Sequence, residues 1–144
     1  NLRKRLVKSP KLYWRDSGLL HSLLGASSRD ALLSSPWAGA SLEGWVIEQI
    51  LGSLTARGTP HRASSFRTSD QEEIDLILET GGRRWAVEIK LTASPSPEDA
   101  RRLKARAALL DSASPVLLTR TSTTVEGGGV LSTNLRGFLA RING

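Results

Sequence analysis

The chain has 144 residues, of which 39% are hydrophobic, enough for one compact domain with a buried core. Its 20 Lys and Arg outweigh 14 Asp and Glu, so the net charge is +6 at pH 7 and an anionic partner such as nucleic acid is favoured. Cysteine is absent, which excludes disulfides and thiolate zinc sites. No apolar run approaches the roughly 20 residues that span a bilayer, so we expect a soluble, cytoplasmic domain without a membrane partner.

Residues 1–40 are expected to form an N-terminal helical segment that packs on a core made by residues 41–144. Leucines at helical spacing predict a helix from about residue 17 to the glycine at position 25, and a second short helix over residues 30–33. His21 lies on the first of these without another metal ligand at helical spacing. Because the sequence begins with asparagine rather than methionine, we expect a piece of a longer protein.

A longer helix is predicted from residue 41 to about residue 57, because apolar side chains recur there at helical spacing. Its apolar face consists of Leu42, Trp45, Val46, Ile50 and Leu54. Glu43 is aligned with the N-terminal end of an apolar stripe, where an unpaired buried carboxylate is costly. Either a metal site supplies its partner or the helix dipole favours its charge, and the pattern suits both explanations equally.

Residues 73–91 predict a β-hairpin that follows a strand over residues 63–68. Apolar and polar side chains alternate along both arms, which is the period of half-buried strands. The glycine pair at 81–82 supplies a two-residue turn, because glycine adopts the required backbone angles without a steric penalty. That turn pairs Thr80 with Arg83 and Leu78 with Trp85.

The same register places Asp75 opposite Glu88, with the two Cβ atoms roughly 4.5–5.5 Å apart. Lys90 leaves the same face as Glu88, and the other face carries Ile74, Leu76, Val87 and Ile89. Opposed like charges cost stability unless a cation binds between them, and Mg²⁺ prefers such hard oxygen ligands. The neighbouring ammonium would then orient a metal-bound water. A solvated face with a surface Glu88–Lys90 pair has the same spacing, so the spacing alone leaves both interpretations open.

A helix followed by a buried strand is predicted in the second half of the chain. Ser96 as a cap, proline at the first helical position and two acids in the first turn mark the start of that helix. Arg101 and Arg102 lie largely on its outer side, where they either follow a phosphate backbone or form a solvated face. The remaining predicted elements are a strand over 116–119, an edge strand at 130–131 and a helix over 134–142.

The predicted order α-β-β-β-α-β, with an acid on the first helix, Asp on the second strand and Glu-x-Lys on the third, resembles the restriction-endonuclease-like, PD-(D/E)xK nuclease superfamily. A closer resemblance is to the C-terminal domain of unknown function carried by many prokaryotic AAA-type ATPases. It is carried by residues 8–20, Leu42-Glu43, Phe66-Arg67-Thr68, Glu73-Ile74-Asp75 and Val87-Glu88-Ile89-Lys90. The resemblance implies an α/β fold with a restriction-endonuclease-like core, a mixed sheet flanked by helices.

The resemblance also implies a site and its cofactor. The superfamily's metal and catalytic positions fall on Glu43, Asp75, Glu88 and Lys90. In that transfer Asp75 and Glu88 hold Mg²⁺ or Mn²⁺, and the backbone carbonyl of Ile89 adds a ligand. Lys90 aids the attacking water, and Glu43 orients a water or a second metal. One departure is Ile74, which stands where the superfamily signature has proline.

Two classes of function follow from this resemblance. The first is a Mg-dependent DNA phosphodiesterase, an endo- or exodeoxyribonuclease coupled to an N-terminal ATPase module of the same chain that alone would bind ATP. Arg67, together with Arg101 and Arg102, is then expected to contact nucleic-acid phosphates. The second is a non-catalytic nuclease-fold module that docks DNA or protein for the ATPase.

Overall fold

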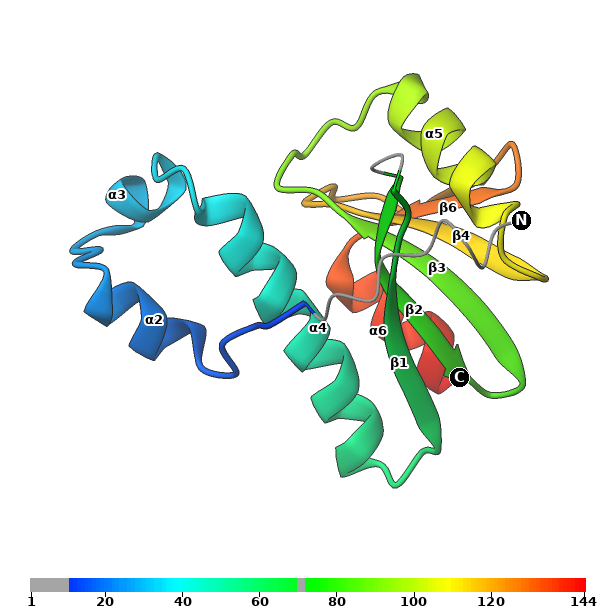
Figure 1. The fold of residues 1–144 in the computed structure, drawn as a ribbon, viewed down its shortest axis with the longest axis horizontal. Coiled ribbons are helices and arrows are strands. Elements are labelled where there is room, and N and C mark those ends of the chain that lie inside the picture. The colour runs from blue at the N-terminus through cyan, green and yellow to red at the C-terminus, as the bar shows by residue number, and fades with distance from the viewer. Residues whose placement is uncertain (1–10, 70–71) are drawn as a thin grey trace.

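The computed structural model describes residues 11–69 and 72–144, and these form an α/β fold around one mixed sheet (Figure 1). The described helices are α2 (Ser17–Leu23), α3 (Arg29–Leu33), α4 (Ala38–Ala56), α5 (Pro97–Ala107) and α6 (Leu135–Asn143). The strands are β1 (His61–Arg67), β2 (Glu73–Thr80), β3 (Arg83–Ile89), β4 (Ala113–Leu118), β5 (Val125–Gly127) and β6 (Val130–Thr133). The α/β class and the order α-β-β-β-α-β from α4 to β4 are therefore confirmed. Residues 8–10 of the N-terminal motif lie outside the described residues.

The six described strands lie in the order β1-β2-β3-β4-β6-β5. Strands β1 to β3 form an antiparallel meander, whereas β4 pairs parallel to both β3 and β6, and β5 pairs antiparallel to β6. Helix α5 makes the crossover from β3 to the parallel strand β4, a connection that two adjacent parallel strands require. The sheet therefore joins an antiparallel half to a parallel half along β3.

Helices cover both faces of the sheet. Helices α4 and α6 pack on one face, where the core consists of Val46, Ile47, Ile50, Leu54, Leu76, Leu78, Trp85, Val87, Val116, Leu118, Leu131 and Phe138. Helix α5 covers the other face through Leu103 and Ala107. The second half of β4 is buried from both sides, with Val116 and Leu118 in the core beneath α4 and Leu117 beneath α5, which explains its apolar run.

The turn between β2 and β3 has the predicted geometry. Gly81 and Gly82 have φ angles of 57° and 72°, both in the left-handed region that glycine tolerates. Thr80 pairs with Arg83 and Leu78 with Trp85, so the predicted register is confirmed near the turn.

Farther from the turn, β2 departs from regular alternation. Ser64 of β1 pairs with Ile77, but Phe66 pairs with Ile74, so three steps along β2 match two along β1. Such a bulge turns the side chains that follow it toward the opposite face. Ile74 consequently packs with Phe66 on the α5 side, while Leu76 packs in the core beneath α4. The prediction that Ile74 and Leu76 share one face is therefore wrong.

Helices α2 and α3 lie beside the N-terminal part of α4, away from the sheet (Figure 1), and neither contains a buried residue. Side chains of Asp16 and Ser28 cap them by accepting backbone N–H bonds. Helix α4 begins at Ala38, three residues before the predicted start at 41. Within the described residues, the structure has no helix with the length and apolar character that a bilayer crossing requires.

Candidate functional site

Asp75 lies on β2 next to the bulge and is largely buried, with a side chain 13% exposed. Its Oδ2 accepts a hydrogen bond from the backbone N–H of Ile89 at 2.8 Å, and its Oδ1 is 3.3 Å from the ammonium of Lys11. Burial and the nearby charge of Glu43 raise the pKa of Asp75, against the opposing effects of Ile89 and Lys11. Asp75 is therefore a carboxylate that the fold keeps in an unfavourable environment.

Lys11 lies at the centre of the acids on the α4 side. Its Nζ is 2.6 Å from Oε1 of Glu43 and 3.3 Å from Oδ1 of Asp75, and it also contacts the carboxylate of Glu73. The hydroxyl of Tyr13 also donates to Glu43. Burial alone would lower the pKa of Lys11, but hydrogen bonds to Glu43 and Glu73 raise it overall, so the ammonium stays charged. We call these five residues the Lys11 cluster.

Glu43 lies in the second turn of α4, because the helix begins at Ala38. The first turn of α4 contains no acidic residue, and the helix dipole acts mainly within that turn. Of the two explanations that the sequence left open, a dipole-favoured charge is thus the weaker one. The partners of Glu43 are instead the side chains of Lys11 and Tyr13.

Glu88 and Lys90 are oriented toward α5. Oε2 of Glu88 is 3.3 Å from Nη1 of Arg106, and its Oε1 is 4.0 Å from Nζ of Lys90. Lys90 in turn lies 3.1 Å from Oδ1 of Asp99, which sits in the first turn of α5. Burial and the charge of Asp75 raise the pKa of Glu88, while Arg106 and Lys90 act in the opposite direction. We call Glu88, Lys90, Asp99 and Arg106 the Glu88 cluster.

The two clusters adjoin across β2 and β3 without merging. The described ladder between these strands ends at Leu76 and Val87, so Asp75 does not continue it as the direct partner of Glu88. The predicted face-to-face arrangement of these two acids is therefore corrected: the bulge in β2 turns Asp75 toward α4. The clusters are nevertheless neighbours, because Asp75 accepts a hydrogen bond from the backbone of Ile89 and its charge helps to raise the pKa of Glu88.

The oxygen atoms at this site are of the kind that bind a divalent cation, but the side chains are not arranged around one. Carboxylate oxygens and a backbone carbonyl are hard ligands of the kind that Mg²⁺ and Mn²⁺ accept. Within residues 11–69 and 72–144, however, no three acidic or histidine side chains are arranged as a metal-binding group. Ammonium and guanidinium groups of Lys11 and Arg106 already contact the carboxylates. A cation would bind after one of these contacts opens.

The predicted phosphate-contacting arginines occupy separate places. Arg67 is exposed at the end of β1. Arg101 and Arg102 lie on the outer side of α5, where each makes an ion pair with Glu98 at 2.6 and 2.8 Å. Both also line a surface depression with Arg106, which contacts Glu88. The side chains of Arg101, Arg102 and Arg106 therefore form a series along α5 that ends at Glu88.

The sequence did not single out Lys11, Glu73 or Arg106. Lys11 and Glu73 fall within the segments that carried the resemblance, which was the only signal available for them. Arg106 is one of several bases on α5, and the helical pattern predicted that their side chains point outward, so nothing distinguished Arg106 from the others. Its side chain turns back to Glu72 and Glu88.

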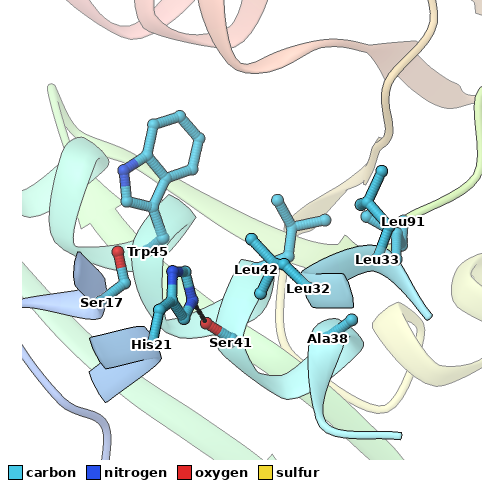
Figure 2. A pocket seen from close by; sticks show the side chains of 9 residues that line it. All are labelled: Ser17, His21, Leu32, Leu33, Ala38, Ser41, Leu42, Trp45 and Leu91. Atoms are coloured by element: carbon cyan, nitrogen blue, oxygen red, sulfur yellow. Dashed lines mark hydrogen bonds between the residues drawn. The ribbon is translucent and has the colours of Figure 1, made fainter. Parts of the chain in front are cut away.

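A second pocket lies between α2, α3 and α4. Figure 2 shows His21 directed at Ser41, with Nε2 2.6 Å from Oγ, beside the apolar side chains of Leu32, Leu42 and Trp45. The ring of His21 also stacks on Trp37 at a centroid distance of 5.6 Å. His21 thus has a hydrogen-bonding partner in Ser41 and an aromatic partner in Trp37.

Comparisons with known proteins found two similar proteins and one matching family. Two mycobacterial proteins, "Uncharacterized protein Mb2031c" of Mycobacterium bovis and "Uncharacterized protein Rv2008c" of Mycobacterium tuberculosis, are each 46% identical over 96 residues, which is 67% of this chain and 21% of the relative. The chain thus spans about a fifth of the length of these relatives. No solved structure matched the chain. The family described as "Domain of unknown function (DUF4143)" matches residues 38–136, from the start of α4 into α6. The chain therefore belongs to this family.

Proposed function

We propose that this domain is a metal-dependent phosphodiesterase that acts on DNA, built on a restriction-endonuclease-like core. In this proposal Asp75 and Glu88 are the acidic ligands, and Lys90 assists the attacking water. The domain would work in the cytoplasm, attached to an N-terminal ATPase module of a longer chain. The relatives support this arrangement insofar as most of their length lies outside the matched part.

The observation that carries the proposal is the environment of Asp75 and Glu88. Both carboxyl groups lie on adjacent strands, and burial raises the pKa of each. The charge of Asp75 adds to the rise in the pKa of Glu88, and the charge of Glu43 adds to the rise in the pKa of Asp75, so the three neighbouring acids cost stability. Acids with raised pKa values cluster at functional sites, because catalytic and metal-binding groups require such environments.

The arginines of α5 support a nucleic-acid substrate. Arg101, Arg102 and Arg106 line one depression, and the innermost of them contacts Glu88. Guanidinium groups bind phosphate oxygens in two-point contacts, so this series would hold a DNA backbone next to the acids. The net charge of +6 favours the same partner.

The residues present define how each would act. Asp75, Glu88 and the carbonyl of Ile89 would hold Mg²⁺ or Mn²⁺, which supplies Lewis acidity and a water of lowered pKa. Lys90, with its ammonium 4.0 Å from Glu88, would orient the attacking water and offset charge on the phosphate. Glu43 would accept a hydrogen bond from a water on the α4 side.

One observation favours a non-catalytic docking module as the second function. All four predicted site residues already have partners within the chain: Glu43 and Asp75 contact Lys11, Glu88 contacts Arg106, and Lys90 contacts Asp99. A set of ion pairs of this kind also holds helices to a sheet without any reaction. A docking module would keep these pairs when DNA binds.

A cleavage assay separates the two functions. The domain is incubated with single- and double-stranded DNA, with and without an excess of Mn²⁺ or Mg²⁺. The phosphodiesterase predicts metal-dependent cleavage that Lys90→Ala and Asp75→Asn abolish. Glu126→Gln, which removes an exposed ion pair with Arg141 on the far edge strand, is the matched control and leaves cleavage intact. Cleavage that survives Lys90→Ala would contradict the assignment.

A further inference from the structure

Lys11 occupies the place where a cation would meet Asp75. Its ammonium contacts Glu43, Glu73 and Asp75 from a segment, residues 11–16, that belongs to no helix or strand. Three carboxylates with one ammonium leave this group with an excess of negative charge. A divalent cation in place of the ammonium would reduce that excess further, by one more positive charge.

Residues 11–16 are held to the rest of the protein on one side only. Lys11 and Tyr13 face inward, whereas Leu12 is 91% exposed and Trp14 is 55% exposed. Tyr13 adds a hydrogen bond to Glu43 and packs against α4 at Gly44. A Cβ atom at Gly44 would lie 3.0 Å from Cδ1 and 3.3 Å from Cβ of Tyr13, so the ring requires a residue without a side chain there. The segment is therefore held at three places: Tyr13 packs on α4, Lys11 lies among the acids, and Arg15 is 3.3 Å from Oε2 of Glu48.

We propose that residues 11–16 form an inhibitory strap, in which Lys11 serves as a built-in counter-ion that must leave before a divalent cation binds at Asp75. This inference rests on the proposed function, because it concerns the regulation of the same site. The strap explains why the acids lack the arrangement of a metal centre within the described residues. It also gives Tyr13 and Gly44 a role, since they seat the strap without touching Asp75.

Metal binding then competes with the strap. Any free energy that holds Lys11 and Tyr13 in place is subtracted from the affinity for the cation, because the binding-competent state is only a fraction of the population. Weakening the strap raises that fraction and tightens the apparent metal affinity. A partner that captured the exposed side chains of Leu12 and Trp14 would have the same effect.

Titration calorimetry with Mn²⁺ alone tests this competition in the 144-residue chain. Lys11→Met removes the ammonium at similar length, and we expect it to tighten binding by about tenfold or more. Lys11→Arg retains the charge and is the matched control, with an affinity close to that of the unsubstituted chain. Gly44→Ala leaves every charge in place, favours the helix by propensity and displaces Tyr13, so a gain of a few-fold is expected.

Limited proteolysis with trypsin provides the second readout, because trypsin cleaves after lysine and the side chain of Lys11 is held among three acids. In the unsubstituted chain, Mn²⁺ should speed cleavage after Lys11 if the strap leaves, while β2 and β3 stay resistant. Unchanged affinity in both Lys11→Met and Gly44→Ala, or metal binding without faster cleavage after Lys11, would overturn the proposal. Circular dichroism confirms that each variant is folded, and the Gly44 variant decides the matter if Lys11→Met fails to fold.

These outcomes are independent of DNA cleavage. Tighter metal binding by the strap variants without any cleavage would retain the strap and refute the phosphodiesterase. Metal-dependent cleavage with unaltered affinity in those variants would retain the phosphodiesterase and refute the strap.

Discussion

Replacing Asp75 by asparagine is expected to stabilise this protein at neutral pH. The asparagine side chain has the same size, and its carbonyl oxygen continues to accept the hydrogen bond from Ile89. The cost of burying a charge and the repulsion from Glu43 both disappear. Lys11 loses its most distant carboxylate, at 3.3 Å, but retains Glu43 and Glu73. The change therefore removes more unfavourable interactions than favourable ones.

The gain should be about 1 kcal/mol at pH 7, within the range of common stabilising substitutions. For a domain of this size that corresponds to a rise of about 3–4 °C in the melting temperature. The folded-state pKa of Asp75 is raised, so the stability that its protonated form contributes is fully present below the unfolded pKa of about 3.9 and is lost as the pH rises through the folded pKa. The advantage of the variant over Asp75 should therefore shrink toward acid pH.

Chemical denaturation with urea at pH 7 and near pH 4 measures both effects. Glu126→Gln, at an exposed ion pair on the opposite edge of the sheet, serves as the control and should leave stability unchanged at either pH. A loss of stability in Asp75→Asn at pH 7 would refute the reasoning, because it would mean that the Lys11 contact outweighs burial and repulsion. An advantage that grows toward acid pH would refute it equally.

Two further substitutions test the fold. Gly81→Ala should destabilise the protein by about 1–2 kcal/mol, because Gly81 has a φ of 57° and a residue with a side chain has a steric cost at that angle. The control is Gly52→Ala in α4, where a Cβ atom would meet open space, and it should cause no loss of stability. Urea denaturation measures both variants. Phe138→Ala should cost about 3–5 kcal/mol, because the ring is fully buried and packs edge-to-face with Trp85. A smaller loss at Phe138, measured by the same method, would mean that α6 contributes little to the core.

The hairpin was predictable because its signals are local. Alternating side chains and the glycine pair at 81–82 fix the strands and the turn within one short stretch, and the pairing of Leu78 with Trp85 follows by counting. Helix α5 was predictable for the same reason, since the capping box of Ser96 and Asp99 is formed within four residues.

The bulge in β2 was not predictable, because it depends on pairing with a different strand. Its presence appears only where Ser64 and Phe66 of β1 meet Ile77 and Ile74. Alternation within β2 gave Asp75 the orientation of an ideal strand, and a single extra residue reverses such an orientation. The sequence therefore identified Asp75 but did not predict that its side chain turns toward α4 and contacts Lys11.

The Lys11 cluster escaped prediction because its contacts span long distances along the chain. Lys11 lies 32 residues from Glu43 and 64 residues from Asp75. A base in a positively charged N-terminal stretch has the pattern of a solvated residue, and no local rule distinguishes one such lysine from its neighbours. Only the arrangement of α4 and β2 brings the three acids to one ammonium.

The melting temperature of the protein in a Mn²⁺ titration shows whether Asp75 and Glu88 form a metal site. Selective binding to the folded state should raise it, by a free energy that reaches about 2.7 kcal/mol at one hundred times the dissociation constant. We expect the combined variant Asp75→Asn with Glu88→Gln to lose this metal-dependent rise, while Glu126→Gln retains it. An equal rise in the combined variant, or no rise in the unsubstituted chain and in the strap variant Lys11→Met, would contradict a metal site at these acids.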